Sequence, residues 1–161
     1  MSTINRRRPT LRIAVQCATT ACNVPTVARI RQWARAALPS AARVTIRIVG
    51  RAEGRMLNRS YRRKDYATNV LTFVFRDQPP LEGDIALCAP VITHEARVQH
   101  KTIAAHYAHM VVHGLLHLQG HDHENAREAA AMERRERTLL ARFGYPDPYR
   151  SAARPPAARG A

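Results

Sequence analysis

Apolar residues recur at two periods along the chain, and these periods predict its strands and helices. Alternating apolar and polar residues indicate strands at residues 11–17 and 42–50. A run of β-branched and aromatic residues indicates a strand at residues 69–75, and "GDIALC" indicates another at residues 83–88. Residues 76–83, "RDQPPLEG", predict a turn-rich connection between these two strands.

Apolar residues at helical spacing predict five helices. The first spans residues 25–38, and a short second helix spans residues 51–62. The rest of the chain to about residue 143 is helical in pattern, which predicts three further helices within residues 89–100, 102–120 and 123–144. The last one is expected to end at Gly144, because Gly adopts the left-handed cap conformation and Pro146 and Pro148 prevent a new start.

The order of these elements predicts one mixed sheet covered by helices. A strand, a helix, a strand, a helix and two strands are followed by three helices. The length of 161 residues fits a single domain with a substantial core. We expect this domain at residues 11–149, between a disordered basic lead at residues 1–10 and a disordered Ala/Arg/Pro tail at residues 150–161.

Composition argues against an exported or membrane protein. No apolar run approaches the roughly 18 residues of a membrane span. The opening "MSTINRRRPTLRIAVQ" has basic residues but no apolar core of an export signal behind them. The three cysteines lack a ligand-like spacing and are expected to be reduced thiols. We therefore expect a cytoplasmic protein without a membrane partner.

The charge favours a polyanionic partner such as RNA. The chain has 26 basic and 12 acidic residues, a net charge of +14. Such a surplus attracts nucleic acid and speeds its capture. The alternative is a general bias of the composition towards Ala and Arg, which the closing "SAARPPAARGA" illustrates.

The segment "HGLLHLQGHDH", residues 113–123, predicts a metal site. His113 and His117 are four residues apart on a predicted helix, so their rings project from one face. Gly120 predicts the end of that helix, after which the chain reverses and His123 can bind the same ion. This spacing matches the ligands of the metzincin zinc proteases. Three neutral imidazoles leave a fourth position for water, which is typical of a catalytic zinc site.

The roles of two residues near this segment, His109 and Asp122, are open at this point. His109 lies one turn before His113 and either belongs to a competing ligand set with His113 and His117 or lies behind the ligands. Histidines on three successive helical turns rarely converge on one ion. We therefore favour the ligand set that includes His123. Asp122 either orients a ligand histidine or caps the following helix.

Gly114 occupies the position at which metzincins carry a catalytic Glu. A peptidase of that type would therefore lack its general base, so proteolysis is disfavoured. A zinc ion can lower the pKa of its bound water to roughly 7, so a nucleophile is available without that Glu. No other residue stands out as a general base.

Three blocks, "LNRSYRRKDYATNVLTFVF", "GDIALC" and "AHMVVHGLLHLQGHDH", together resemble the YbeY family of bacterial endoribonucleases, the rRNA maturation factors. The resemblance covers residues 43–149 well. It implies a single α+β domain with a mixed, mostly four-stranded sheet, about five helices and a metal site at the end of the His-bearing helix. The residue between Gly120 and Asp122 varies in the family, which supports His121 as a bystander.

The resemblance also implies a function. A metal ion, usually zinc, would be held by His113, His117 and His123, and the arginine important for activity maps onto Arg62. The family resembles single-strand-specific endoribonucleases that act in 16S rRNA 3′-end maturation and ribosome quality control. The implied partners are rRNA and ribosomal particles, with a small-subunit ribosomal protein and an assembly GTPase as further candidates.

The residues around Arg62 fit phosphodiester cleavage. A guanidinium offers a fixed fork of donors to the negative charge that develops on non-bridging oxygens. Arg63 and Lys64 are candidate RNA-binding residues, with a solvated charge run as the alternative, and Asp65 is expected to cap a turn or pair with a base. The competing function is a non-catalytic ribosome-assembly factor with a structural metal.

Overall fold

The computed structural model describes residues 9–150, so the expectations for residues 1–8 and 151–161 lie outside the described part of the chain. Within it, the strands and helices follow the predicted order. They are β1 (Leu11–Ala18), α1 (Val27–Ala37), β2 (Ala42–Val49), α2 (Arg51–Arg62), β3 (Val70–Arg76), β4 (Leu81–Cys88), α3 (Ala89–Val98), α4 (Ile103–Leu118) and α5 (Ala126–Arg142).

The four strands form one mixed sheet in the order β1-β2-β4-β3. The β1–β2 and β2–β4 pairs are parallel, whereas β3 is antiparallel to β4 and forms an edge. In register, Ile46 lies between Val15 and Ile85, and all three side chains point towards the helical layer. The predicted α+β class with a four-stranded sheet and five helices is confirmed.

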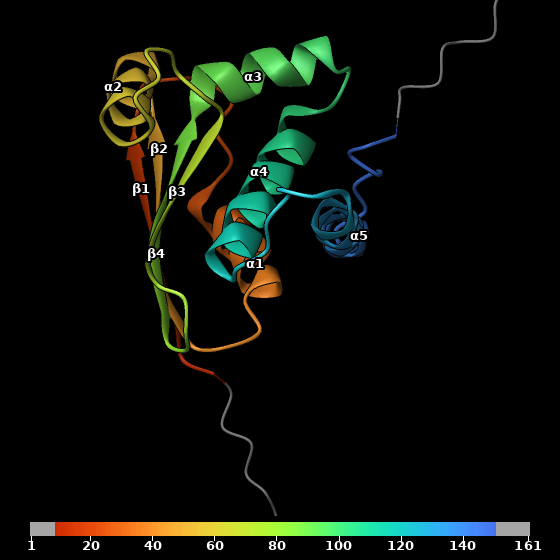
Figure 1. The fold of residues 1–161 in the computed structure, drawn as a ribbon. Helices are drawn as coiled ribbons and strands as arrows, with labels where there is room; N and C mark the ends of the chain where they lie inside the picture. Colours follow the sequence, from red (N-terminus) through yellow and green to blue (C-terminus); the bar gives the residue numbers. More distant parts are fainter. Residues whose placement is uncertain (1–8, 151–161) are drawn as a thin grey trace, which may run out of the picture.

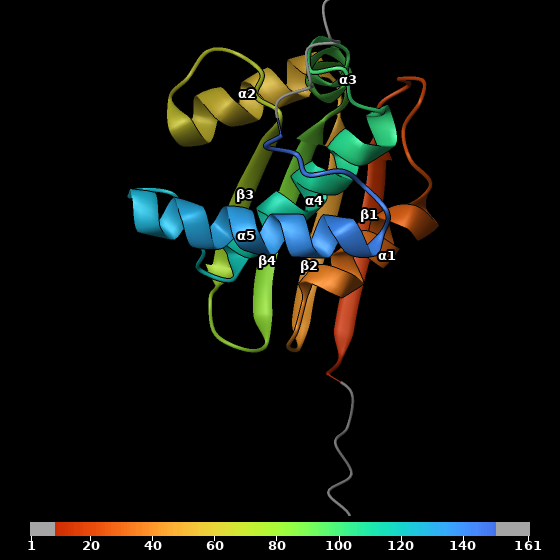
Figure 2. The same cartoon turned by 90° about the vertical axis from the view of Figure 1, so that its right-hand side faces the viewer.

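The helices are layered mainly on one face of the sheet. Figure 1 shows α1, α3 and α4 beside the sheet, with α5 farther out. Figure 2 shows α5 running across the outside of α4. Helix α4 is therefore the central helix, and twelve of its sixteen residues are buried. It packs against α1, α3, α5, β3 and β4, which fixes the position of the histidines that it carries.

Helix α2 packs where β2 and β4 end. A Cβ added at Gly54 would lie 3.0 Å from the Cys88 Sγ and 3.6 Å from the Val49 Cγ2. Only a residue without a side chain permits this approach, so Gly54 brings α2 close to the sheet. In Figure 1, α2 lies on the side of the sheet opposite α4, and most of its remaining side chains are exposed.

The β3–β4 connection is shorter than the sequence predicts. Glu82 pairs with Arg43 on β2 and with Arg76 on β3, so β4 begins at Leu81. Gly83 resembles a turn residue in the sequence, but its role is close packing. A Cβ there would lie 2.6 Å from the carbonyl oxygen of Phe73 and 2.5 Å from a Leu118 methyl carbon.

Buried apolar side chains of the sheet, α1 and α4 form the core, with Trp33, Ile46, Ile85, Tyr107, Leu115 and Leu116 among the largest. None of the helices in residues 9–150 combines the length and apolar character that crossing a membrane requires.

Candidate metal centre and cleft

The end of α4 brings the three predicted ligands together. His113 and His117 occupy successive turns, and α4 then ends in the predicted reversal at Gly120, whose φ is +91°. The N–H of Gly120 donates to the carbonyl of His117, and the N–H of His121 donates to the carbonyl of Leu116. This pair of bonds is a Schellman motif, which satisfies the last carbonyls of the helix and turns the chain back.

The returning chain places His123 beside the two helical histidines. Its ring centroid lies 5.1 Å from that of His117 and 6.0 Å from that of His113. Each of the three residues offers a nitrogen within 4.8 Å of the others. The Nε2 atoms of His113 and His117 are 3.2 Å apart. Two nitrogens that share a tetrahedral zinc ion at roughly 2.0–2.1 Å are about 3.3 Å apart, so this donor set fits one such ion.

Behind the ligands lies a buried carboxylate that the sequence analysis missed. Glu136 of α5 is fully buried, and its Oε1 is 3.5 Å from the His113 Nδ1, the nitrogen that does not face His117. The Tyr149 hydroxyl donates to Glu136 at 2.9 Å, and His109 Nε2 contacts the second carboxylate oxygen. A carboxylate in this position holds a ligand imidazole in one tautomer and one orientation.

A signal for Glu136 is present in the sequence. Glu136 lies four residues after Met132 and three before Leu139, on the apolar stripe of α5. In the Arg- and Glu-rich run "MERRERTLL" it resembles one more solvated charge. The helical period therefore separates it from its exposed neighbours, whereas composition does not.

His109 contacts Glu136 and Tyr149 rather than His117. Its side chain is buried against Glu136 and Tyr149. His109, His113 and Glu136 also form a compact group with metal-binding atoms. Two of these residues are buried and hydrogen-bonded to each other, so the group best serves as the rear support of His113. The competing ligand set of His109, His113 and His117 is not the one the fold assembles.

Burial and neighbouring charges shift the pKa values in this region. Burial, followed by repulsion from His113 and His123, lowers the pKa of His117 and favours the neutral form that binds metal. Burial also lowers the pKa of His109. For Glu136, burial opposes ionisation, but hydrogen bonds from His109 and His113 outweigh it and lower the pKa to about 2.

Asp122 does not cap α5. The N-cap is Asn125, whose side chain accepts from the N–H of Glu128. The helix starts later than the sequence predicted because Asn125 is the better-placed acceptor. Asp122 Oδ1 instead accepts from the backbone N–H of His123 and lies 3.9 Å from the Nδ1 of that histidine. Of the two interpretations of Asp122, the helix cap is wrong, and the position beside His123 fits the other.

Gly114 allows α4 to lie against the sheet. An added Cβ would meet Ile85 carbons at 3.1 and 3.2 Å and the Thr72 Oγ1 at 3.3 Å. The residue that follows the first histidine therefore faces β3 and β4, not open space. A Glu in this position would press its Cβ against Ile85 and Thr72, so packing as well as sequence disfavours the peptidase mechanism.

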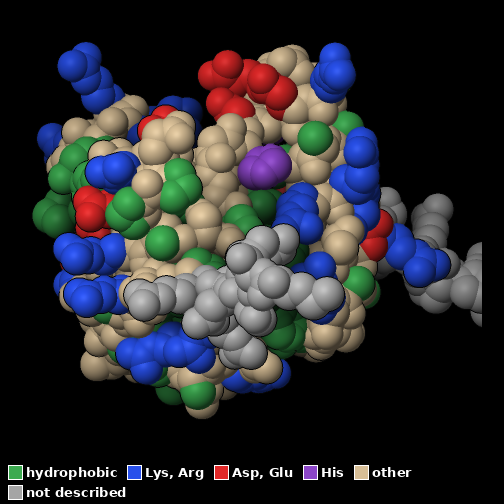
Figure 3. All heavy atoms as spheres, turned by 90° about the horizontal axis from the view of Figure 1, so that it is seen from below, with side chains coloured by type: hydrophobic (Ala, Val, Ile, Leu, Met, Phe, Trp, Pro, Cys, Tyr) green, Lys and Arg blue, Asp and Glu red, His purple; other side chains and the backbone are tan. Residues whose placement is uncertain are grey.

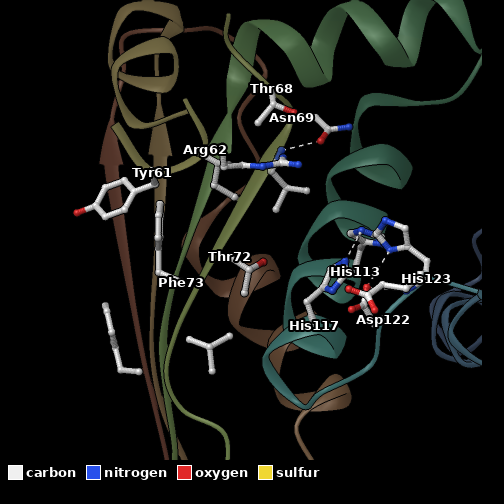
Figure 4. A pocket seen from close by; sticks show the side chains of 15 residues that line it. Tyr61, Arg62, Thr68, Asn69, Thr72, Phe73, His113, His117, Asp122 and His123 are labelled. Carbon is white, nitrogen blue, oxygen red and sulfur yellow. Dashed lines mark hydrogen bonds and ion pairs between the residues drawn. The ribbon is translucent and has the colours of Figure 1, made fainter. Parts of the chain in front are cut away.

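A cleft of about 890 Å³ lies between the histidines and the β3 edge. Arg62, the last residue of α2, lines it together with all three ligand histidines. Figure 4 shows the Arg62 side chain extending into the cleft towards the helix that carries His113 and His117. The cleft is further lined by Tyr61, Thr68, Asn69, Val70, Leu71, Thr72, Phe73, Val74, Phe75, Asp122 and Glu124.

The residues after Arg62 lie elsewhere. Arg63 adopts the left-handed conformation (φ 57°) as the C-cap of α2, and neither Arg63 nor Lys64 lines the cleft. Asp65 accepts two hydrogen bonds from the Arg55 guanidinium, each of 2.8 Å, which confirms its expected pairing with a base. This pairing lowers the pKa of Asp65.

The positive charge is not confined to the cleft. Seen from below, Lys and Arg side chains surround the outline of the molecule, while acidic side chains gather mainly in one group at the top of the view (Figure 3). Overall charge therefore does not identify an RNA-binding surface, and the surface has to be located from the arrangement of particular residues.

Fold and site define a single-domain α+β protein with a three-histidine centre suited to a metal ion, set in an open cleft. The chain belongs to the YbeY family: the family model described as Endoribonuclease YbeY matches residues 15–144. A protein of that name from Aromatoleum aromaticum is 58% identical over 125 residues, which cover 78% of this chain and 81% of that protein.

Other relatives extend the similarity over nearly their whole length. The Endoribonuclease YbeY of Nitrosomonas eutropha is 53% identical, covering 85% of this chain and 97% of that protein. That of Methylobacillus flagellatus is 51% identical, covering 91% and 98%. The solution structure of TM1509 from Thermotoga maritima has a TM-score of 0.53 at 20% identity, covering 88% of this chain and 99% of that one, and so shares the fold.

Proposed function

We propose that this protein is a metal-dependent endoribonuclease that acts in rRNA processing, with single-stranded RNA at the 3′ end of 16S rRNA as its substrate and a role in ribosome quality control. Family membership supports the class of reaction. The observation that carries the proposal is the single cleft in which Arg62 faces the three-histidine group.

His113, His117 and His123 are the proposed metal ligands, and zinc is the proposed ion. Three imidazoles suit zinc and leave a position for water. The bound ion would supply a water nucleophile near neutral pH or polarise the phosphate. Glu136 orients His113 from behind, and Asp122 lies beside His123.

Arg62 is the proposed catalytic residue of the opposite wall. Its guanidinium can donate two parallel hydrogen bonds to the non-bridging oxygens of the phosphate and stays ionised at any working pH. Charge on those oxygens grows as the bond is cleaved, so the same contacts become stronger in the transition state. Arg63 and Lys64 follow Arg62 in the chain without lining the cleft, and their proposed role is to bind phosphates farther along the RNA.

The proposed setting is the cytoplasm, with rRNA in ribosomal particles as the macromolecular partner. A small-subunit ribosomal protein and an assembly GTPase are the proposed protein partners. The net charge of +14 supports association with RNA-rich particles. A non-catalytic assembly factor with a structural metal is the second candidate, favoured by the breadth of the positive surface.

Cleavage of a structured RNA with a single-stranded 3′ extension tests the proposal. We would compare the wild type with His113→Ala and Arg62→Ala, and with Arg134→Ala on the exposed face of α5 as the control. Metal content and RNA affinity are measured for each protein. Arg62→Ala is expected to keep its metal and lose about 10²–10³-fold in kcat, in line with the removal of one transition-state donor.

The control separates enzyme from contaminant. Arg134→Ala should cleave like the wild type, and His113→Ala should lose both metal and cleavage. Equal residual cleavage by all four proteins would mean that a contaminating ribonuclease made the cuts. The assembly-factor candidate would then replace the proposed one.

A further inference from the structure

Helix α2 presents a row of arginines to solvent. Arg51, Arg55 and Arg59 are exposed and lie one turn apart, so they follow one side of the helix. Residues 51–66 hold six basic and two acidic side chains, a net charge of +4. We call Arg51, Arg55 and Arg59 the arginine row.

The two acidic side chains of this stretch leave most of the row uncompensated. Glu53 is held by Arg47 of β2 at 2.8 Å, and Asp65 is held by Arg55. Among the ion pairs of residues 9–150, neither Arg51 nor Arg59 has an acidic partner. The pair between Arg55 and Asp65 is exposed on both sides and so exchanges readily for another anion.

The row borders a hollow and leads to the cleft. A hollow of about 650 Å³ lies along α2 and is lined by Ala52, Arg55, Met56, Arg59, Ser60 and Asp65. The C-terminal residue of the same helix is Arg62, which lines the main cleft. Any strand bound at Arg62 therefore has a basic surface beside it along α2.

Two exposed aromatic side chains line the cleft itself. Tyr61 and Phe75 are each 67% exposed, and both line the cleft. Tyr61 packs edge-on against Phe73 with ring centroids 4.6 Å apart, which holds its ring in place. Figure 4 shows Tyr61 and Phe73 on the side of the cleft opposite the histidines. Exposed rings beside a basic groove offer stacking surfaces for unpaired bases.

We propose that the arginine row is a phosphate-binding track for the single-stranded RNA that runs out of the cleft, with Tyr61 and Phe75 stacking its bases inside the cleft. This inference rests on the proposed function, since it extends the substrate path beyond the scissile phosphate. Arginines four residues apart on a helix are spaced about 6 Å along its axis, and each can bind a phosphate.

An RNA strand explains the arginine row together with the exposed rings better than an acidic protein does. Both partners would pair with arginines, but the row ends at the proposed catalytic Arg62, and the exposed rings in the cleft suit unpaired bases. The track would also explain a preference for unpaired RNA, because bases within a duplex have no free faces to stack on protein rings.

The test compares two triple variants of equal charge. Arg51→Gln, Arg55→Gln and Arg59→Gln remove the row, while Arg127→Gln, Arg134→Gln and Arg142→Gln remove three exposed arginines of α5. The affinity of the metal-loaded protein for a long single-stranded phosphorothioate RNA is measured at several salt concentrations. Each lost phosphate contact lowers the slope of log affinity against log salt by about 0.7, so the row variant should lose about 2.

The α5 variant should keep a slope close to that of the wild type. A short oligonucleotide that fills only the cleft should bind all three proteins alike. Phe75→Ala provides a second measurement that changes no charge: it should weaken binding of the long RNA about 5- to 150-fold and leave the slope unchanged. Thermal melting of each variant confirms that these exposed substitutions leave the fold intact.

Equal slopes for the two triple variants would overturn the track and leave the row as a solvated face or a surface for an acidic protein. Failure of the proposed function gives a different result. In that case the wild type does not cleave even the short RNA. The row variant still has a smaller slope of log affinity against log salt than the α5 variant. If the wild type cleaves RNA but the two triple variants have equal slopes, the phosphate-binding track is wrong and the proposed function stands.

Discussion

The cleft has two walls built on different principles. On the α4 wall, His113 is backed by a fully buried carboxylate, Glu136, and by Tyr149. On the α2 and β3 wall, Arg62, Tyr61 and Phe75 are exposed. One wall is held by packing and hydrogen bonds, and the other presents charge and rings to solvent.

This difference matches what each wall is proposed to bind. Holding a metal ion requires several donor atoms fixed within a fraction of an ångström, so the ligands need rigid support from behind. Gripping a polyanion of variable conformation requires charge and stacking surfaces whose side chains can adjust. Substitutions on the α4 wall should therefore alter stability and metal affinity, while those on the α2 wall should alter RNA binding and cleavage with little effect on stability.

The largest effect on the α4 wall is expected for Glu136→Ala. It leaves His109, His113 and Tyr149 without their buried acceptor. Removing one partner of a buried charged pair costs about 3–5 kcal/mol of unfolding free energy. Metal affinity should fall about 10–100-fold, as is usual when the support of a ligand is lost. Urea unfolding of the apo-protein and metal titration measure the two effects.

Glu133→Ala on the same helix is the matched control. Glu133 is partly exposed and pairs with Arg137 at 3.5 Å, so its loss should cost no more than about 0.5 kcal/mol and leave metal affinity unchanged. Similar results for the two variants would show that the α4 wall does not depend on its buried carboxylate.

Acid should weaken the α4 wall through the same residue. Hydrogen bonds outweigh burial and lower the pKa of Glu136 to about 2 in the folded state, against an ordinary value of 4.5. Because the folded-state pKa is lowered, its contribution is fully present above pH 4.5 and is lost as the pH falls from 4.5 towards 2. The difference corresponds to about 3 kcal/mol.

Unfolding of the metal-free protein at several pH values across that window checks the expectation. Glu136→Gln should flatten this part of the stability profile. An unchanged decline in that variant would assign the acid sensitivity to other carboxylates.

A smaller effect is expected where α4 touches the sheet. Gly114→Ala gains about 1 kcal/mol of helix propensity, but its methyl group would lie 3.1 Å from Ile85, which is fully buried. Overpacking of a core costs about 1–3 kcal/mol, so we expect a net loss of about 1 kcal/mol. The control is Gly50→Ala, where the nearest atom is the Thr19 Oγ1 at 3.8 Å. Thermal or urea unfolding measures the stabilities. If Gly114→Ala is as stable as the wild type, the sheet shifts at this contact to make room for the methyl group.

The sequence predicted which three histidines come together on the α4 wall, but not the buried residues behind them. The spacing of His113, His117 and Gly120 encodes a local structure, one helical face followed by a reversal, so a single segment sufficed. The support joins Glu136 and Tyr149 to His113 across distant segments, and only packing brings them together. The apolar stripe of α5 was the one local sign of it.

The fold was predictable to a similar degree. Alternation and helical spacing gave the order of every element, because these patterns follow the local period of the backbone. The start of β4 was predicted two residues late, because a Gly at position 83 suits a turn as well as the close packing against Phe73 and Leu118 that the structure has there. The arrangement of the α2 wall could not be predicted, because a run of arginines looks the same whether it borders a cleft or faces bulk solvent.

The smallest effect on stability is expected on the α2 wall. Asp65→Asn breaks the exposed pair with Arg55, and such pairs contribute little to stability because solvent screens them. The same change frees Arg55 and removes a negative charge beside the arginine row, so affinity for long single-stranded RNA should rise at low salt. Glu133→Gln removes one negative charge far from the row and serves as the control. If Asp65→Asn binds RNA no more tightly than that control, Arg55 does not contact RNA. A gain in affinity that disappears at high salt would assign the contact to a phosphate.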